Sequence, residues 1–451
     1  MTKKILRLLT LFTALLLTQK SNAQADATKS FTLKEAQDYA LKNNVNNMNA
    51  TLDDLIAKSY NKEIRGIGFP QINGSFDVKD FVEIPTSLIP ADFLPGGIPG
   101  TYFPVKFGTK YNATAGISAS QIIFSSDYFL ALKASKALLE LSYKSSERTK
   151  VETQIAVAKA YYGVLVFRQR LKLMYANIDR IRKLKDDTKA LYDNGFVEKI
   201  DNDRVELSYN NLIVEKEKVE RLVSLTEYAL KFQMGMEIAT PITLTDSLDL
   251  STPMNPELLI SNKPTYSNRI EYQLLQNQEK LNRLELKRYR LSYLPSIAAY
   301  GSVSANAQRN KFDIFDTDKG WYPTGVIGAT LNLPIFDGFQ KHFKSQQVKL
   351  KIQKTQNSIK SFESAMDLDV ASASANFQNA QSSLNTQKKS IELAENVYTV
   401  TKIKYTEGVG SNSEVVTAET ALKEAQTNYY SSLYDYLIAK VDWDRANGNI
   451  K

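Results

Sequence analysis

The sequence of 451 residues contains no cysteine and a single histidine, His342. The lack of cysteine excludes disulfide bonds and thiol catalysis, and one histidine cannot form a histidine-based metal cluster within one chain. No paired-carboxylate or glycine-rich motif indicates an active site, so we expect no cofactor and no enzymatic activity. The formal charge of +8 includes four cations within the first 23 residues, and the excess of +4 spread over the rest of the chain is not the footprint of a nucleic-acid-binding protein.

Long apolar runs are also scarce, and the one at the N-terminus has the pattern of a signal peptide. Basic residues precede the apolar run 8–17, and Ser21-Asn22-Ala23 offers a small-x-small cleavage site. A membrane anchor, the alternative, needs a longer apolar run. We therefore predict a signal peptide over residues 1–23, export of the mature chain, and no transmembrane helix in the rest.

The remaining sequence reads as two copies of one unit. Residues 66–72 resemble residues 292–297, and residues 192–195 resemble residues 405–408, which lie 213 positions later. Self-similarity of this kind indicates an internal repeat. We predict three segments after the signal peptide, namely a first repeat over 24–237, an inter-repeat segment over 238–264 and a second repeat over 265–451.

Four segments alternate apolar and polar residues, two in each copy. They lie at 71–79 and 111–120 in the first copy, and at 296–306 and 327–333 in the second. Period two with one apolar face is the signature of a strand, and in an exported protein it suits lipid on one side and water on the other. An ordinary sheet with one wet face is the alternative. The surplus segment 84–106 of the first copy contains five prolines, which argues against regular structure there.

Aromatic pairs precede the second strand of each copy. They are Tyr102-Phe103 and Trp321-Tyr322. Aromatic residues gather at membrane interfaces, so either a girdle at such an interface or ordinary loop packing would explain them.

Long stretches without proline follow the strand pairs. Residues 127–192 and 337–405 are each predicted to form one helix, on the order of 100 Å long at about 1.5 Å per residue. Each is followed by a returning helix, over 200–234 and 413–446. In the first long helix, apolar residues recur at steps of four and three, as in a coiled coil: Val151, Ile155, Ala158, Tyr162 and Leu165.

Four strands cannot close a barrel of usable bore by themselves. A β-structure in a membrane must be closed, because an open edge leaves backbone groups unsatisfied in hydrocarbon. Single-chain barrels use at least about eight strands. Association of identical copies would close the sheet, and either two or three copies would serve.

The order and spacing of these elements resemble the TolC family of outer-membrane efflux proteins over nearly the whole mature chain. Residues 31–36 are similar to the family's opening helix, where Thr32 and Glu35 would form a capping box. Residues 331–338, Leu-Asn-Leu-Pro-Ile-Phe-Asp-Gly, look like the family's strand-to-helix junction. Residues 405–419 resemble the family's second hairpin tip.

This resemblance implies a mixed α/β membrane protein that forms a homotrimer in the outer membrane of a Gram-negative bacterium. Four strands per chain would contribute to a twelve-stranded transmembrane barrel in contact with lipid, and long antiparallel coiled-coil helices would form a periplasmic α-barrel. The segment 238–264 would form a belt around this tunnel. The channel would passively conduct substrates from an inner-membrane pump of the RND or ABC class and a periplasmic adaptor protein, in efflux or type I secretion. A periplasmic coiled-coil adaptor or a structural envelope protein is the alternative, and nucleic acid is not an expected partner.

The resemblance also implies a gate at the inner ends of the hairpins. Asp201 and Glu414 each lie six residues after a tip glycine, and three copies of each would form carboxylate rings that favour cations. Helix N-termini also favour acidic residues, so a simple role in the first helical turn stays open. The further candidates for the gate and for the tip turns that contact the adaptor are Tyr405, Thr417, Asn194, Gly195, Gly408 and Gly410.

Overall fold

The structure is a computed structural model that describes residues 29–93, 95–96, 98–246, 248 and 265–450. The predicted signal peptide 1–23 and most of the inter-repeat segment lie outside the described residues. By their contacts the residues divide into a hairpin unit (Met1–Thr51, Ser146–Ile270 and Phe362–Lys451) and a sheet unit (Leu52–Ser145 and Glu271–Ser361). None of the helices in the described ranges combines the length and apolarity needed to cross a membrane.

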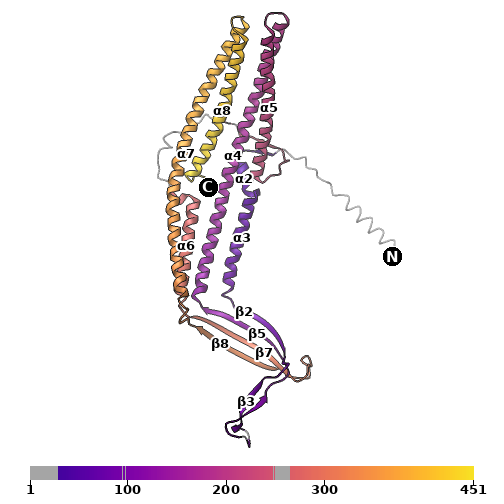
Figure 1. Cartoon of the computed structure of the whole chain (residues 1–451), viewed down its shortest axis with the longest axis vertical. Coiled ribbons are helices and arrows are strands. Elements are labelled where there is room, and N and C mark those ends of the chain that lie inside the picture. Colours follow the sequence, from indigo (N-terminus) through magenta and orange to yellow (C-terminus); the bar gives the residue numbers. More distant parts are fainter. Residues whose placement is uncertain (1–28, 94, 97, 247, 249–264, 451) are drawn as a thin grey trace, which may run out of the picture. The chain divides into compact units, whose positions relative to one another are not determined.

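The two halves of the chain contain the same elements in the same order (Figure 1): a helix, two sheet strands, a very long helix and a returning helix. In the first half these are α3 (Val45–Gly66), β2 (Gln71–Asp80), β5 (Tyr111–Phe124), α4 (Ser126–Asp193) and α5 (Lys199–Met234). In the second half they are α6 (Ile270–Leu291), β7 (Ser296–Arg309), β8 (Tyr322–Asn332), α7 (Gln340–Thr406) and α8 (Asn412–Ala446).

The predictions of four long helices are confirmed, with ends that agree to within three residues. The helix ends could be predicted because they depend on local sequence: proline is absent from the helix interiors, and a glycine follows shortly after each helix. Helix α5, for example, ends at Gly235, whose φ of 68° is left-handed and whose N–H points back to the last helical turn.

The coiled-coil stripe predicted on α4 is only part of its buried surface. Ala158 and Leu165 of that stripe are buried, but the most deeply buried positions between residues 151 and 165 are Val157, Tyr161 and Val164, which the predicted stripe leaves out. One side of α4 packs against α2 (Leu33–Asn43) and the end of α5, and Val166 packs against α7 and α8 instead. A helix with neighbours on two sides buries two stripes, which a single seven-residue seam does not describe.

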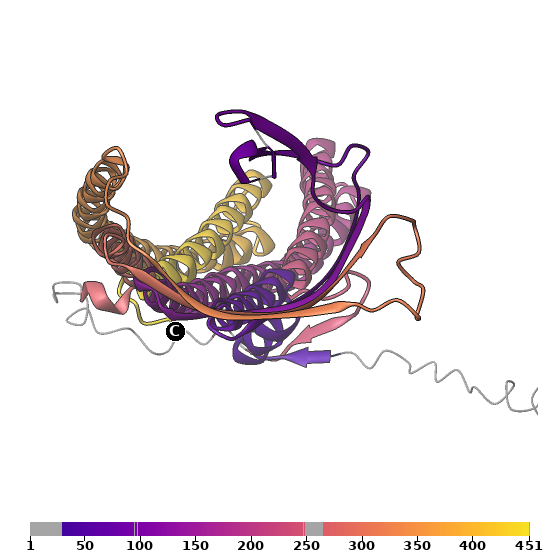
Figure 2. The same ribbon diagram turned by 90° about the horizontal axis from the view of Figure 1, so that it is seen from below.

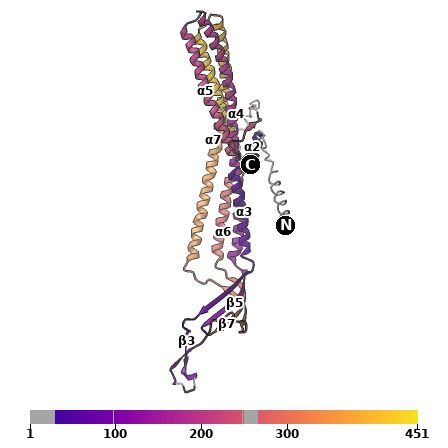
Figure 3. The same ribbon diagram turned by 90° about the vertical axis from the view of Figure 1, so that its right-hand side faces the viewer.

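The four predicted strands form one antiparallel sheet in the order β2-β5-β7-β8 (Figure 1). Figures 2 and 3 show the same sheet from two further directions. Paired residues share a face, and the register places Ile117 opposite Val303 and Gly301 opposite Ile327. Their even-numbered neighbours, such as Ser118 opposite Ser302, lie on the other face. The sheet therefore has one apolar face and one polar face, and large side chains of the apolar face are exposed.

The expectation that residues 84–106 lack regular structure is wrong. Strands β3 (Thr86–Pro90) and β4 (Tyr102–Lys106) form an antiparallel ribbon, joined through the short helix η1 (Ala91–Phe93). Pro104 lies within β4, opposite Leu88. Proline is tolerated here because both strands of a two-stranded ribbon are edge strands, so a missing N–H costs no hydrogen bond on the open side.

Next to the hairpins, the N-terminal segment is held by a small parallel pairing of β1 (Lys29–Phe31) with β6 (Ile242–Leu244). The predicted capping box of α2 is confirmed, because the Glu35 N–H donates to Thr32 and the Thr32 N–H donates to the Glu35 carboxylate at 2.8 Å. Asp246 accepts hydrogen bonds from the Leu33 N–H at 2.7 Å and from the hydroxyl of Tyr161 at 3.0 Å. Through Asp246, these contacts connect the start of α2 to the segment after β6 and to α4.

Gly235 lies where α5 ends against α2, and its replacement is expected to destabilise this junction. A Cβ at position 235 would lie 2.3 Å from the carbonyl oxygen of Asn43, in addition to the strain of a left-handed residue. Left-handed backbone alone costs about 1–2 kcal/mol for a residue with a Cβ. We expect Gly235→Ala to lower the midpoint of thermal unfolding more than Gly195→Ala does. Gly195 also has a left-handed φ of 80°, but a Cβ added there would meet no atom within 4 Å. Equal shifts in the two variants would contradict this packing.

Candidate functional site

The predicted tip residues lie in two matching turns. The first tip (194–198) joins α4 to α5, and the second tip (407–411) joins α7 to α8. Gly195 and Gly408 have φ of 80° and 75°. In each turn the glycine N–H and the N–H of the next residue bond back to carbonyls of the last helical turn, for example Gly195 to Tyr192 at 2.9 Å. This is the Schellman arrangement, which satisfies the free carbonyls of a helix end.

The two tips end in exposed apolar side chains. Phe196 and Val409 directly follow the turn glycines and are 77% and 78% exposed. Asn194 is held locally, because its side-chain amide donates to the Ala190 carbonyl at 2.7 Å. The tips thus offer apolar contact on rigidly held turns.

Both predicted gate carboxylates lie in the first turn of a returning helix. Asp201 lies in α5, with its carboxylate 3.8 Å from Arg204. Glu414 lies in α8 and is exposed, and its N–H donates to the hydroxyl of the capping residue Ser411 at 3.2 Å. The positions suit both the gate hypothesis and a simple role at helix N-termini.

The structure joins the two tips through a residue that the sequence analysis missed. The side-chain amide of Asn412, a buried residue, donates to the backbone carbonyl of Asp201 at 3.2 Å. Asn412 belongs to α8 and Asp201 to α5, so this contact links the start of one returning helix to the start of the other.

The remaining candidates have local partners. Tyr405 packs against the apolar core of the hairpins, and its hydroxyl is buried without a hydrogen-bond partner among the described residues. The Thr417 hydroxyl donates to the Ser413 carbonyl at 2.8 Å. A Cβ on Gly410 would lie 3.0 Å from the Tyr405 nitrogen and from the Lys404 Cβ, so the second tip needs glycine there to fold against the end of α7.

A stripe of buried polar residues runs along α8 between the hairpins. Its members are Asn412, Glu419 and Gln426, spaced seven residues apart and 3–4% exposed. They alternate with the buried apolar residues Val415 and Leu422. We call this set the polar seam. Seven residues are two helical turns, so these side chains share one line along the helix.

Each member of the polar seam contacts the first hairpin. Asn412 reaches Asp201 as described, and the Asn177 amide donates to Gln426 at 2.7 Å. The guanidinium of Arg180 lies 3.7 Å from the Glu419 carboxylate. Polar residues at such positions fix the register of packed helices at a cost in stability, so this contact surface is specific but weaker than an apolar one.

Among the members of the polar seam, Glu419 has the largest free-energy cost of burial, because its side chain can carry a charge. Burial raises the pKa of its carboxyl, against the lowering effect of Arg180, Lys402 and Lys423. One carboxylate oxygen has no hydrogen-bond partner among the described residues, so the ion pair is incomplete. Burial and the nearby carboxylate also raise the pKa of Tyr398, whose ring lies under Arg180, to about 12.

A more exposed ion pair flanks the polar seam. Glu215 of α5 contacts Lys423 of α8, and it lies 3.6 Å from Arg170 of α4. The side chains of Glu215, Arg170 and Lys423 are about a quarter exposed. Water therefore screens both ion pairs, and each adds little to stability. Within the described ranges, no group of three or more histidine, aspartate or glutamate side chains is arranged to hold a metal ion.

Comparisons with known proteins agree with one another. A model of the outer membrane efflux protein family matches residues 271–449. The chain is 22% identical over 363 residues to the outer membrane protein TolC of Escherichia coli (strain K12), covering 76% of this chain and 71% of that protein. It is 19% identical over 338 residues to nodulation protein T of Rhizobium leguminosarum, covering 73% and 70%.

Solved structures share the fold. The outer membrane protein VceC of Vibrio cholerae superposes with a TM-score of 0.69 at 14% identity, covering 92% of this chain and 96% of that chain. The CmeC outer membrane channel of Campylobacter jejuni superposes with a TM-score of 0.72 at 15% identity, covering 93% and 86%. At these identities the likeness establishes the mixed helix and sheet architecture with its long helices.

Proposed function

We propose a function and an assembly for this chain on the basis of its family. As its sequence predicted, the chain belongs to the TolC family of outer membrane efflux proteins. It is an outer-membrane channel of a Gram-negative bacterium that spans into the periplasm and serves as the exit duct of an efflux system. Its family consists of channel and transport proteins, and we propose that the chain itself performs no catalysis. A pump would supply the energy, and this subunit would supply a bore and a gate.

The assembly we propose is a homotrimer with a twelve-stranded barrel. The observation that carries it is the open four-stranded sheet, whose edge strands are β2 and β8 and whose apolar face is exposed. Successive strands run antiparallel, so with an even number of strands β8 of one copy would pair antiparallel with β2 of the next. Closure by copies satisfies both edges and places the apolar face against lipid.

The mass of the detergent-solubilised protein tests this assembly. We expect a particle of three chains that needs detergent to remain in solution. A mature protein that fractionates as a soluble monomer without detergent would refute the proposal.

We propose that the helical hairpins of the three copies form a periplasmic tunnel whose tips dock a periplasmic adaptor. The exposed Phe196 and Val409 support this, because apolar side chains on fixed turns are suited to a protein partner. Through the adaptor the channel would receive substrates from an inner-membrane RND or ABC transporter. Segment 238–264, with the β1–β6 pairing, would belong to a belt around the tunnel.

We further propose that the chain arose by duplication of one unit, with repeats over 24–237 and 265–451. The equal order of elements in both halves supports this. The hairpin unit and the sheet unit each draw on both repeats, so the repeats would fold together rather than as separate domains.

Asp201 and Glu414 are proposed to form carboxylate rings at the tunnel entrance. Six carboxylates near one axis would attract cations and bind divalent ions. We expect the double variant Asp201→Asn/Glu414→Gln to lose most of the channel's cation preference and its block by divalent ions in planar bilayers. Asp193→Asn is the matched control, because Asp193 ends α4 directly before the first tip but is already paired with Lys189 at 3.0 Å. Unchanged selectivity in the double variant would remove these residues from the gate.

A further inference from the structure

Residues 310–321, which connect β7 to β8, fold back onto the sheet. Ile314 in this loop is 1% exposed and packs against Ala113 of β5 and Ala307 of β7. Ala113 and Ala307 are paired in register and lie on the apolar face, in line with Ile117 and Val303. The loop therefore covers one end of the apolar face.

Aromatic contacts extend this cover across neighbouring strands. Phe312 lies edge-on to Tyr111 with ring centroids 5.4 Å apart, and Phe315 lies 6.4 Å from Phe76 of β2. Tyr111 and Phe76 also belong to the apolar face, by the register of β2 with β5. Despite these contacts, Phe312 and Phe315 remain 63% and 74% exposed. Trp321 packs against the same cluster, whereas Tyr322 opposes Asn306 on the polar face.

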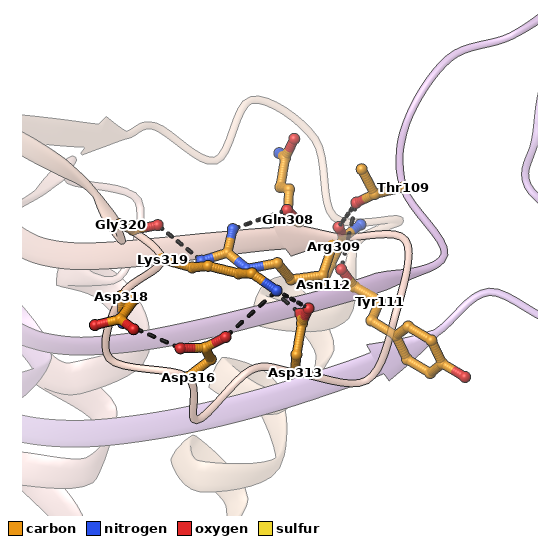
Figure 4. A network of polar contacts seen from close by, with 10 residues as sticks. All are labelled: Thr109, Tyr111, Asn112, Gln308, Arg309, Asp313, Asp316, Asp318, Lys319 and Gly320. Atoms are coloured by element: carbon orange, nitrogen blue, oxygen red, sulfur yellow. Dashed lines mark hydrogen bonds and ion pairs between the residues drawn. The ribbon is translucent and has the colours of Figure 1, made fainter.

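The loop also shelters a cation on the apolar face. Arg309, the last residue of β7, donates to the Gly320 carbonyl at 2.9 Å and to the Gln308 carbonyl at 3.0 Å (Figure 4). Its guanidinium lies 3.7 Å from Asp313, and its side chain is 10% exposed. Lys319 contacts Asp313 and lies 3.4 Å from Asp316. Arg309 and Lys319 are thus paired with carboxylates of the loop itself, while Phe312 and Phe315 remain largely exposed.

We propose that residues 310–321 form a collar that contacts the outer leaflet of the membrane, with Phe312 and Phe315 at the boundary between headgroups and acyl chains. This inference rests on the proposed function, in which the apolar face meets lipid. The collar continues that face, presents aromatic rings where membrane proteins concentrate them, and neutralises Arg309, a charge that is costly against lipid. Lipid, rather than a protein, is the partner because the exposed rings are continuous with the apolar strands.

Single cysteines test the proposal directly, since the chain has no cysteine of its own. Phe315→Cys, Ile117→Cys and Ser118→Cys would each carry an environment-sensitive fluorophore, in trimers reconstituted into dibrominated phosphatidylcholine vesicles. Ile117 marks the apolar face and Ser118 the polar face of the same strand. We expect bromine in the lipid to quench positions 315 and 117, and aqueous iodide to quench position 118.

The controls separate two kinds of failure. Lipid quenching at position 117 but not at 315, with iodide quenching at 315, overturns the collar and leaves the proposed function intact. No lipid quenching at position 117 refutes the lipid-facing sheet itself.

A second readout uses the native chain's own fluorophore, in case labelling at position 315 disturbs the loop. The only tryptophans are Trp321, next to Ile314, and Trp443 in α8. In Trp443→Phe trimers, emission from Trp321 should fall in brominated vesicles relative to unbrominated ones. Equal emission in both would count against the collar.

Discussion

Arginine at position 327 is expected to abolish assembly in the outer membrane, whereas arginine at position 326 is expected to be tolerated. Ile327 lies midway along β8 on the apolar face, opposite Gly301, and is 95% exposed in the single chain. In a barrel it would face the centre of the bilayer, where arginine costs about 2–4 kcal/mol. Three copies incur this cost three times. Val326 opposes Ser302 on the polar face, where arginine would meet water in the bore.

The two variants can be compared by the amount of detergent-resistant trimer recovered from outer membranes. Ile327→Arg should yield little or none, and Val326→Arg should yield nearly the normal amount and shift ion preference toward anions. The same loss in both variants would indicate that β8 tolerates no charge on either side. Loss with Val326→Arg alone would show that the proposed lipid and water faces are reversed.

Removal of Arg180, the α4 partner of Glu419, is expected to weaken the contact between the two hairpins more than replacement of any single member of the polar seam. The Glu419 carboxylate, 5% exposed, would remain without its nearest cation. Breaking one partner of a fully buried ion pair typically costs about 3–5 kcal/mol, because the other charge stays buried. That range is an upper limit here, because the Arg180 side chain is 25% exposed. Arg180→Ala should therefore lower the midpoint of thermal unfolding and, in the proposed trimer, increase leakage of small solutes through the channel.

Replacement of both partners provides the control for this effect. Arg180→Ala/Glu419→Leu leaves no buried charge, and apolar replacements of buried pairs are often neutral or stabilising. The double variant should recover most of the stability lost in the single variant, as a coupled pair requires. Additive losses would show that Arg180 and Glu419 act independently, which contradicts the seam.

The polar seam should also respond to pH through Glu419. Burial raises the pKa of this carboxyl, so its contribution to stability is fully present below the pKa of the unfolded chain and is lost as pH rises through the folded value. Mild acid should therefore stabilise the hairpins, and Glu419→Gln should remove that part of the pH dependence. Melting curves across this pH range, with the Glu215→Gln variant as control, test the expectation. An unchanged pH profile in Glu419→Gln would contradict it.

Elements set by local pattern could be predicted from the sequence. The ends of α4 and α5 follow from the absence of proline within them and from glycine beyond them, and the four sheet strands follow from period two. The β3–β4 ribbon could not be predicted from the proline content of its segment, because an edge strand accepts proline.

The burial of the polar seam could not be predicted from the sequence of α8 alone. Asn412, Glu419 and Gln426 on a helix rich in polar residues resemble a solvated face, and only the packing of α4 and α5, about two hundred residues earlier in the chain, buries them. Their seven-residue spacing, in step with Val415 and Leu422, was the available signal. The predicted gate residues lie at the helix starts, but their convergence depends on copies of the chain rather than on one chain.

The central claim is that this chain forms a water-filled channel by joining open sheets from identical copies. Single-channel recording of the detergent-purified protein in a planar lipid bilayer tests it most directly. The account predicts discrete conductance steps from a particle of three chains, with a preference for cations. A purified protein that remains monomeric and produces no conductance would contradict it.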